Sequence, residues 1–204
     1  MEDASTPPPP APDDTVRGGA GRLAAPRVWR IFAVIAAVML GVDQVTKALA
    51  EHHLEGRPDI QVIGTILQLH LTYNPGAAFS LGTGFTAGLS VLAIVATCVV
   101  LFISRRLVDR IWAVALGLLL AGITGNLVDR IFRDPAPFRG HVVDFLMLPN
   151  WPVFNIADVC INVGVALILL QVLRGIGMDG RRVSDAESAA DDDAPAAPAA
   201  EEGR

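Results

Sequence analysis

The stretch IWAVALGLLLAGITGNLV, residues 111–128, decides the fold class because it is apolar almost throughout and carries no charged side chain. It is about as long as the roughly 20 residues that an α-helix needs to cross a ~30 Å hydrocarbon core. Three further stretches have a similar length and character: Ile31–Leu49, Ala87–Ser104 and Phe154–Leu173. None shows the clean polar face of a helix on the surface of a soluble domain. The sequence therefore predicts an α-helical membrane protein with four transmembrane helices.

The composition changes at both ends of the chain. Residues 1–26 are rich in Pro, Ala and Gly, and residues 176–204 are acidic and rich in Ala and Pro. Such segments lack the apolar surface that a folded core requires, so both are predicted to be disordered tails. Residues 27–175 would then form the membrane domain. The acidic tail contributes much of the net charge of −5, and the absence of a basic cluster with interleaved aromatic residues predicts no nucleic-acid partner.

The positions of the arginines predict the orientation of the four spans. Basic residues crowd before the first span, between the second and third, and after the fourth, at Arg17, Arg22, Arg27, Arg30, Arg105, Arg106, Arg110, Arg174, Arg181 and Arg182. Both termini are therefore predicted to be cytoplasmic, which places loops 50–86 and 129–153 outside. The opposite orientation would put the arginine-dense loop at 105–110 on the wrong side. The first span is expected to be a retained anchor, because it carries charges and lacks a convincing cleavage site.

Polar side chains at the outer ends of the spans predict a functional site. An ionisable group at the centre of a membrane helix costs about 2.5–3.5 kcal/mol, so such groups usually have a role. The predicted topology brings six polar residues to one layer: Asp43, Asn126, Asp129, Asn155 and Asp158 in or beside spans, and Asp144 in the loop between the last two. Lys47, the only lysine of the chain, lies one helical turn after Asp43.

Each of these residues also has a purely structural interpretation. Asn155 is suited to cap the fourth span, with Asp158 completing a capping box. Asp43 and Lys47 have the i,i+4 spacing of a salt bridge within a helix, and the pair at 129–130 suits an ordinary interfacial cluster. Taken one at a time, the structural and functional interpretations are evenly balanced. Their convergence in one layer favours function.

Two carboxylates in an apolar, partly hydrated site are suited to general acid–base chemistry. Close like charges cannot both ionise, so the pair shares a proton, and its ionised member can activate water. Asp144 lies within the apolar run at 142–147, a poor setting for a simply solvated charge. The sequence offers no Gly-x-Ser-x-Gly nucleophile motif, no cysteine near a histidine and no His-Glu-x-x-His zinc motif. No metal or organic cofactor is expected.

Residues 67–73, LQLHLTY, alternate apolar and polar side chains with period two, which predicts a half-buried strand. The turn signal Asn74-Pro75-Gly76 follows it. We therefore expect a small β element on the outer face of the membrane, with His70 on its polar side and exposed.

Five motifs, each short and weak alone, occur together in a fixed order between about residues 28 and 173. They are Asp43-Gln44-Val45-Thr46-Lys47, Asn74-Pro75-Gly76-Ala77-Ala78-Phe79, Gly125-Asn126-Leu127-Val128-Asp129-Arg130, Val142-Val143-Asp144-Phe145 and Phe154-Asn155-Ile156-Ala157-Asp158. In this order, and on this topology, the chain resembles the lipoprotein signal peptidases (signal peptidase II), which are four-span bacterial membrane aspartyl proteases.

The resemblance implies an aspartic endopeptidase that removes the signal peptide from diacylglyceryl-modified prolipoproteins, cutting before the lipid-bearing cysteine. It implies Asp144 and Asp158 as the catalytic pair and Asp129 as a supporting residue held with Arg130. Asn74, Gly76, Asn126, Arg130 and Asn155 would position the substrate or the pair, and Asp43 with Lys47 would brace the first helix. It also implies a small extracytoplasmic β-sheet cradle, membrane lipid as a partner, a bacterial cytoplasmic-membrane location and a site at the outer face. We expect a monomer.

Two other classes of protein remain as alternatives. A small proton- or ion-coupled carrier would use buried carboxylates as a relay. However, the carboxylates cluster at one interface, and four spans without a repeat make a poor alternating-access scaffold. A non-catalytic assembly subunit would use Gly117, Gly122 and Gly125 for close helix packing. That alternative leaves Asp144 and Asp158 without a reason.

Overall fold

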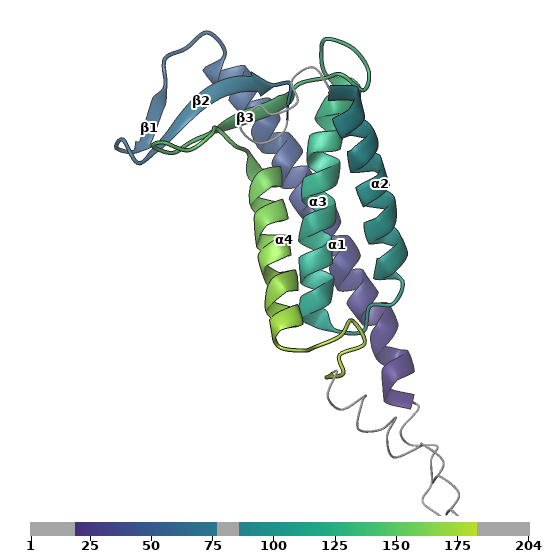
Figure 1. Cartoon of the computed structure of the whole chain (residues 1–204). Coiled ribbons are helices and arrows are strands. Elements are labelled where there is room, and N and C mark those ends of the chain that lie inside the picture. The colour runs from purple at the N-terminus through teal and green to yellow at the C-terminus, as the bar shows by residue number, and fades with distance from the viewer. Residues whose placement is uncertain (1–18, 77–85, 183–204) are drawn as a thin grey trace, which may run out of the picture.

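The computed structural model describes residues 19–76 and 86–182, with side chains described from residue 27 onward. In these ranges the elements are α1 (Gly19–Leu54), β1 (Ile60–Ile63), β2 (Leu67–Asn74), α2 (Thr86–Ser104), α3 (Arg110–Phe132), β3 (Val142–Met147) and α4 (Ile156–Leu173). The helices run side by side as a bundle, and the sheet projects sideways from one end of it (Figure 1).

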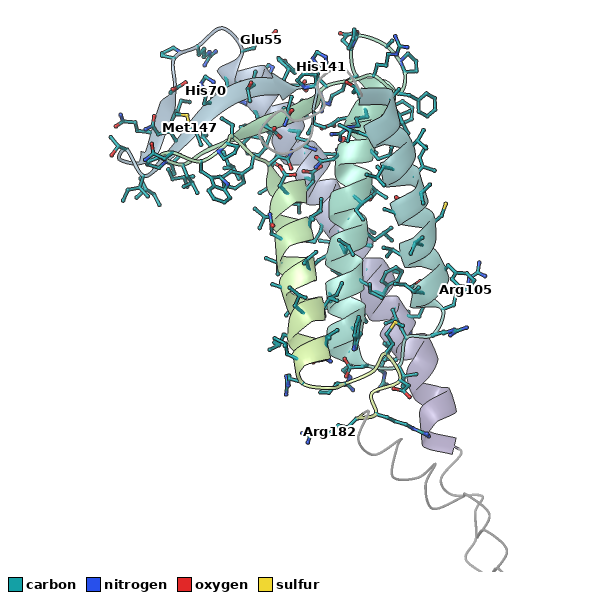
Figure 2. All side chains as sticks on the ribbon, in the orientation of Figure 1. Glu55, His70, Arg105, His141, Met147 and Arg182 are labelled. Carbon is teal, nitrogen blue, oxygen red and sulfur yellow. The ribbon has the colours of Figure 1, made fainter. Side chains whose placement is uncertain are left out.

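The four helices within these ranges are long and apolar enough to cross a membrane, which confirms the predicted spans. Large apolar side chains are exposed on the bundle, among them Val91, Phe102, Leu169 and Leu173. Soluble monomers rarely expose contiguous apolar surface on this scale, whereas lipid accepts it. Figure 2 shows Arg105 and Arg182 at the end of the bundle opposite His70 and Glu55. The chain is a multi-pass membrane protein.

Helix α3 contacts α1, α2 and α4, and small residues set how closely the helices approach. A Cβ on Gly122 would lie 2.4 Å from the Ala157 carbonyl oxygen, and one on Gly117 would lie 2.9 Å from the Phe32 carbonyl oxygen. These glycines therefore pack α3 against neighbours within the same chain. Such close backbone contact is typical of helices that associate in membranes.

The main apolar core lies in the half of the bundle away from the sheet. It is built from Val28, Phe32, Val100, Leu107, Trp112, Ala113, Leu116 and Leu120. A smaller cluster beneath the sheet contains Ala50, Leu54 and Phe145. Between these two clusters the helix interfaces carry polar side chains instead, and this layer forms the candidate site.

The three strands form an antiparallel sheet in the order β1-β2-β3. Strand β2 confirms the strand predicted at 67–73. The structure corrects the prediction that Asp144 lies in a loop, because Asp144 is on β3 and pairs with Thr72. Alternation could not reveal β3, since both faces of its first four residues are buried and its sequence is a nearly continuous apolar run.

The structure describes residues on both sides of the membrane domain predicted at residues 27–175. Helix α1 begins at Gly19. At the other end the chain folds back beneath the bundle, where the Met178 carbonyl accepts from the Val108 and Asp109 N–H groups at 2.9 and 3.1 Å. The Trp112 indole also donates to the Ile176 carbonyl at 3.0 Å. The remainder of the two predicted tails, residues 1–18 and 183–204, lies outside the described residues, as do residues 77–79 of the second motif.

Candidate active site

The start of α4 fixes the position of Asp158. Asn155 is the N-cap of this helix, so the helix begins at Ile156 rather than at the predicted Phe154. The Asn155 side-chain oxygen accepts from the Asp158 N–H at 3.0 Å, and the Asp158 carboxylate accepts from the Asn155 N–H at 3.1 Å. This is the predicted capping box, and it orients the Asp158 carboxylate without using its other oxygen.

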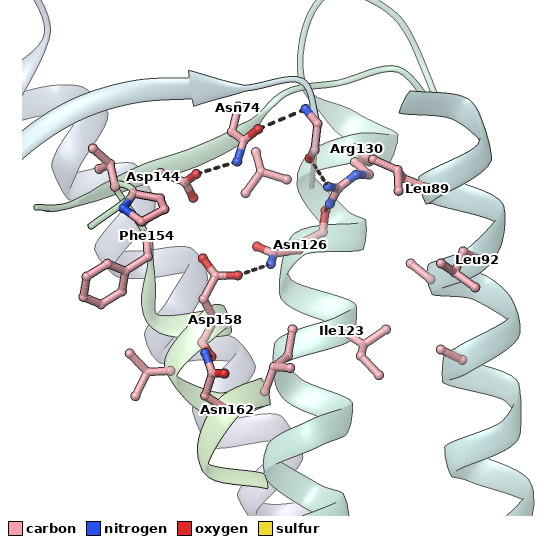
Figure 3. Close-up of a pocket in the computed structure, with 18 of the residues that line it drawn as sticks. Asn74, Leu89, Leu92, Ile123, Asn126, Arg130, Asp144, Phe154, Asp158 and Asn162 are labelled. Atoms are coloured by element: carbon pink, nitrogen blue, oxygen red, sulfur yellow. Dashed lines mark hydrogen bonds between the residues drawn. The ribbon is translucent and has the colours of Figure 1, made fainter. Parts of the chain in front are cut away.

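Asp144 is brought to the same place by the sheet. Its Oδ1 accepts from Asn155 Nδ2 at 2.6 Å. Its Oδ2 accepts from Asn74 Nδ2 at 3.0 Å (Figure 3). Asn74 ends β2, and its own oxygen accepts from the Gly76 N–H at 2.9 Å. Asn155 therefore contacts both carboxylates, one through its side chain and the other through its backbone.

Asn126 of α3 contacts the remaining oxygen of Asp158. Its Nδ2 donates to Asp158 Oδ1 at 2.9 Å. Its Oδ1 accepts from Lys47 Nζ at 3.0 Å and from Asn155 Nδ2 at 3.1 Å. Because two donors meet the oxygen, the amide has one satisfactory orientation, with its N–H₂ group toward Asp158.

Lys47 lies at the centre of a buried ion-pair network. Its Nζ is 3.0 Å from Asp43 Oδ2 and 2.8 Å from Asp129 Oδ2, and all three side chains are at most 1% exposed. The predicted salt bridge between Asp43 and Lys47 is therefore present. The expected pairing of Asp129 with Arg130 is wrong, because Asp129 Oδ1 accepts from Arg133 Nε at 2.9 Å. Arg133 lies one helical turn from Asp129 and reaches it along the helix face.

Helix α1 also holds the first turn of α4. Asp43 Oδ1 accepts from the Ala157 N–H at 2.8 Å, one of the N–H groups that a helix start leaves unpaired. A Cβ on Gly125 would lie 2.5 Å from Asp43 Oδ2, so the approach of α3 to this carboxylate needs glycine. Gln44 donates to the Gly125 carbonyl at 3.1 Å. The carboxylate of Asp43 thus bonds to α4 and packs closely against α3 at the level of the site.

Arg130 lies on the other side of α3 from this network. Its guanidinium donates to the Gly76 carbonyl at 2.9 Å and to the Asn126 carbonyl at 3.2 Å. Arg130 therefore connects the turn that follows β2 to α3, above the two carboxylates (Figure 3).

A cavity of about 770 Å³ opens over this cluster. Its polar end is lined by Asn74, Asn126, Arg130, Asp144 and Asp158. Its walls are mostly apolar and come from α2, α3, α4 and the loop at 151–154. Such a cavity suits an amphipathic ligand whose polar part meets the carboxylates and whose apolar part lies between helices.

The environment of Asp144 favours its protonated form. Burial, and to a smaller extent the nearby charge of Asp158, raise the pKa of Asp144 to about 7, although hydrogen bonds from Asn74 and Asn155 oppose the rise. Two carboxyl groups coupled in this way titrate as a pair and hold one proton between them over a range of pH.

All ten candidate residues from the sequence fall in one connected cluster around the cavity, its ion-pair network included. Sequence reasoning missed Arg133, which pairs with both Asp129 and Glu51. Its spacing from Asp129 was the available signal. It also missed Asn162, which lines the cavity. His70 is partly exposed and pairs with Asp59, away from the cluster. Among the described residues, no group of three His, Cys, Asp or Glu side chains is arranged to hold a metal ion.

A family model described as Signal peptidase (SPase) II matches residues 35–174. The chain belongs to the signal peptidase II family. A curated relative named lipoprotein signal peptidase, from Leifsonia xyli subsp. xyli, is 46% identical over 156 residues, covering 76% of this chain and 72% of the relative. Another of that name, from Mycobacterium leprae, is 45% identical over 162 residues, covering 78% and 81%.

Solved structures described as a bacterial membrane enzyme also resemble this signal peptidase II chain. One is 28% identical with a TM-score of 0.64 and covers 70% of this chain and 87% of the other. A second is 28% identical with a TM-score of 0.61 and covers 70% and 92%. Membership of the signal peptidase II family makes the chain a peptidase, and therefore a hydrolase, in preference to a carrier or an assembly subunit.

Proposed function

We propose that this signal peptidase II removes the signal peptide from diacylglyceryl-modified bacterial prolipoproteins, cleaving before the lipid-bearing cysteine, with Asp144 and Asp158 as its catalytic pair. The observation that carries the proposal is that both carboxylates line the polar end of one cavity whose walls are apolar. The lipid chains would lie along those walls, while the scissile bond meets the carboxylates. The relatives named lipoprotein signal peptidase support this substrate class.

The pair hydrolyses the peptide bond by general acid–base catalysis. The ionised carboxylate takes a proton from water as the water oxygen attacks the scissile carbonyl carbon. The protonated carboxyl group gives its proton to the carbonyl oxygen, which yields a tetrahedral diol. When the tetrahedral diol breaks down, the carboxyl group that took the proton from water protonates the leaving amine, and the C–N bond breaks. The other carboxylate takes a proton back from the diol. One water is consumed, and the pair ends with the single proton it began with.

The remaining residues keep the pair in place. Asn74, Asn126 and Asn155 donate hydrogen bonds to the carboxylates, which limits their rotation and leaves them facing the cavity. Arg130 holds Gly76 over the site, and the network around Lys47 braces α1 against α3 and α4. The enzyme acts as a monomer on this proposal, because one chain supplies every group named.

We place the site at the extracytoplasmic face of the bacterial cytoplasmic membrane, with both termini cytoplasmic. The bundle end opposite the sheet carries Arg105 in the short connection between α2 and α3 and Arg182 in the segment after α4 (Figure 2), and the positive-inside rule assigns this end to the cytoplasm. The carboxylates then lie near the outer leaflet, where the lipid chains of an exported prolipoprotein are anchored.

The test is cleavage by the purified full chain in detergent of one prolipoprotein prepared with and without its diacylglyceryl group. We expect cleavage of the lipidated form alone, with mass spectrometry showing a product that begins at the modified cysteine. Equal cleavage of both forms, or a cut elsewhere in the sequence, would contradict the proposed substrate.

The activity is expected to decline as the pH rises through about 7. Asp144 keeps its proton up to its raised pKa of about 7, so more alkaline solution removes the single proton that the pair requires. The hydrogen bond from Asn74 favours the carboxylate, so Asn74→Leu should raise the pKa of Asp144 further. In kcat/KM measured against pH, the alkaline limb of Asn74→Leu should lie at higher pH than that of the wild type.

A His141→Asn variant serves as the control, because it removes the histidine next to β3 without touching Asp144. Its alkaline limb should coincide with that of the wild type. If the alkaline limb moves in His141→Asn but not in Asn74→Leu, the pH dependence belongs to the histidine and not to Asp144.

A further inference from the structure

Asn162 is a polar side chain in the apolar part of the cavity wall. It follows Asp158 by four residues, so it lies on the same face of α4, about 6 Å further along the helix axis at 1.5 Å per residue. Figure 3 shows Asn162 next to Asp158, on the side away from Asn74 and Arg130. The other lining residues of α4 beyond Asp158 are Val159, Ile161 and Val163.

The fold uses only part of the hydrogen-bonding capacity of this amide. Asn162 Nδ2 donates one hydrogen to the Asp158 carbonyl at 2.9 Å. The second Nδ2 hydrogen and the side-chain oxygen have no partner among residues 27–76 and 86–182. A polar group in a membrane span is costly to leave unpaired, and Asn162 is exposed to the cavity rather than buried. Because Asn162 lines the cavity, its second N–H is within reach of a ligand bound there.

We propose that Asn162 is a specificity-determining residue that donates a hydrogen bond to an ester carbonyl of the diacylglyceryl group. This inference rests on the proposed function, because that function places the lipidated cysteine in the cavity. An ester carbonyl accepts hydrogen bonds and cannot donate them, which matches the free N–H of Asn162. The neighbouring wall residues on α4 are hydrocarbon and offer no competing donor.

The length of the substrate fits the position of Asn162. The lipidated cysteine links its amide nitrogen to the nearer ester carbonyl through Cα, Cβ, the thioether sulfur and the glyceryl carbons. That path has about seven covalent bonds of roughly 1.5 Å each. Even when bent, it spans the single helical turn between Asp158 and Asn162. The scissile bond can therefore meet the carboxylates while the ester meets the amide.

The test compares two lipopeptide substrates of equal chain length, one with ester links and one with ether links in place of the carbonyls. The wild type should prefer the ester, and Asn162→Leu should lose this preference. The variant should raise KM for the ester substrate about three- to tenfold, the range expected for one neutral hydrogen bond. Its kcat, and its KM for the ether substrate, should stay at the wild-type values.

Thr97→Val is the matched control. Thr97 lies in α2, its hydroxyl donates to the Ala93 carbonyl one turn earlier at 2.8 Å, and it does not line the cavity. This variant also removes a polar group from a span, but it should keep the wild-type preference for the ester.

The outcomes separate this inference from the function on which it rests. If Asn162→Leu keeps the ester preference while Asp144→Asn is inactive on both substrates, the proposed function stands and the role of Asn162 is wrong. If Asn162→Leu lowers kcat equally on both substrates, the residue acts by positioning Asp158, which also overturns the inference. Full activity of Asp144→Asn would instead contradict the proposed function.

Discussion

Replacing Asp158 with asparagine is expected to slow cleavage of a lipidated substrate by about 10²- to 10⁴-fold, the range that general acid–base catalysis contributes. Asparagine has nearly the same shape and keeps one oxygen that can accept the hydrogen bond from Asn126. It cannot exchange a proton with water or with the leaving amine. Asp144→Asn should have an effect of the same order, because the two groups act as a unit and either loss removes the shared proton.

The measurement is kcat/KM for the lipidated prolipoprotein, accompanied by thermal unfolding of each purified variant in detergent. Asp59→Asn is the matched control: Asp59 is an exposed carboxylate paired with His70, so both its activity and its unfolding temperature should match the wild type. Activity above a tenth of the wild-type value in a well-folded Asp158→Asn or Asp144→Asn preparation would remove that residue from the catalytic pair.

The parts of the fold that could be predicted are those whose signal is local. Each span is a long apolar run, so its length alone indicates a membrane helix. The capping box at Asn155 and the salt bridge between Asp43 and Lys47 follow from spacings of three and four residues along one helix. The strand at 67–73 alternates apolar and polar side chains along its sequence. In all these cases the interacting residues are neighbours in sequence.

The parts that could not be predicted depend on which elements meet. Strand β3 is buried on both faces, so it shows no alternation, and only its pairing with β2 places Asp144 beside Asn74. The segment at 176–182 is polar and rich in glycine, yet it folds because its carbonyls meet donors on α3 and on the loop before it. Whether Asn162 faces the cavity or the lipid likewise depends on how α4 is rotated against α3, which the sequence of α4 alone does not determine.

The candidate site was predictable because membrane helices can afford few polar groups. Asp43, Asp129 and Asp158 stand out in apolar stretches, and their convergence at one level of the membrane indicated a functional layer, although each alone also had a structural interpretation. Their pairing was harder to predict. Asp129 turns toward α1 to meet Lys47, while Arg130, the next residue, points to the opposite side of α3. Successive helical residues differ by about 100° in direction, so adjacency in sequence was a misleading guide to contact.

Lys47→Met is expected to destabilise the folded protein by about 3–5 kcal/mol, the usual cost of removing one partner from a buried ion pair. Methionine fills a similar volume, so the loss comes from charge rather than from a cavity. Without the ammonium group, Asp43 and Asp129 face each other as buried carboxylates that no cation between them neutralises. The measurement is thermal unfolding in detergent, which should show a markedly lower unfolding temperature.

Two further variants show whether charge is the cause. Arg133→Met also removes a cationic partner of Asp129, but Arg133 is 23% exposed and Lys47 still neutralises Asp129, so the loss should be at most about 1 kcal/mol. Adding Asp129→Asn to Lys47→Met removes one of the two buried carboxylates that Lys47 had neutralised, so the double variant should unfold at a higher temperature than Lys47→Met alone. A Lys47→Met protein with normal unfolding but little activity would instead show that Lys47 acts on the reaction, through its hydrogen bond to Asn126 and hence on Asp158.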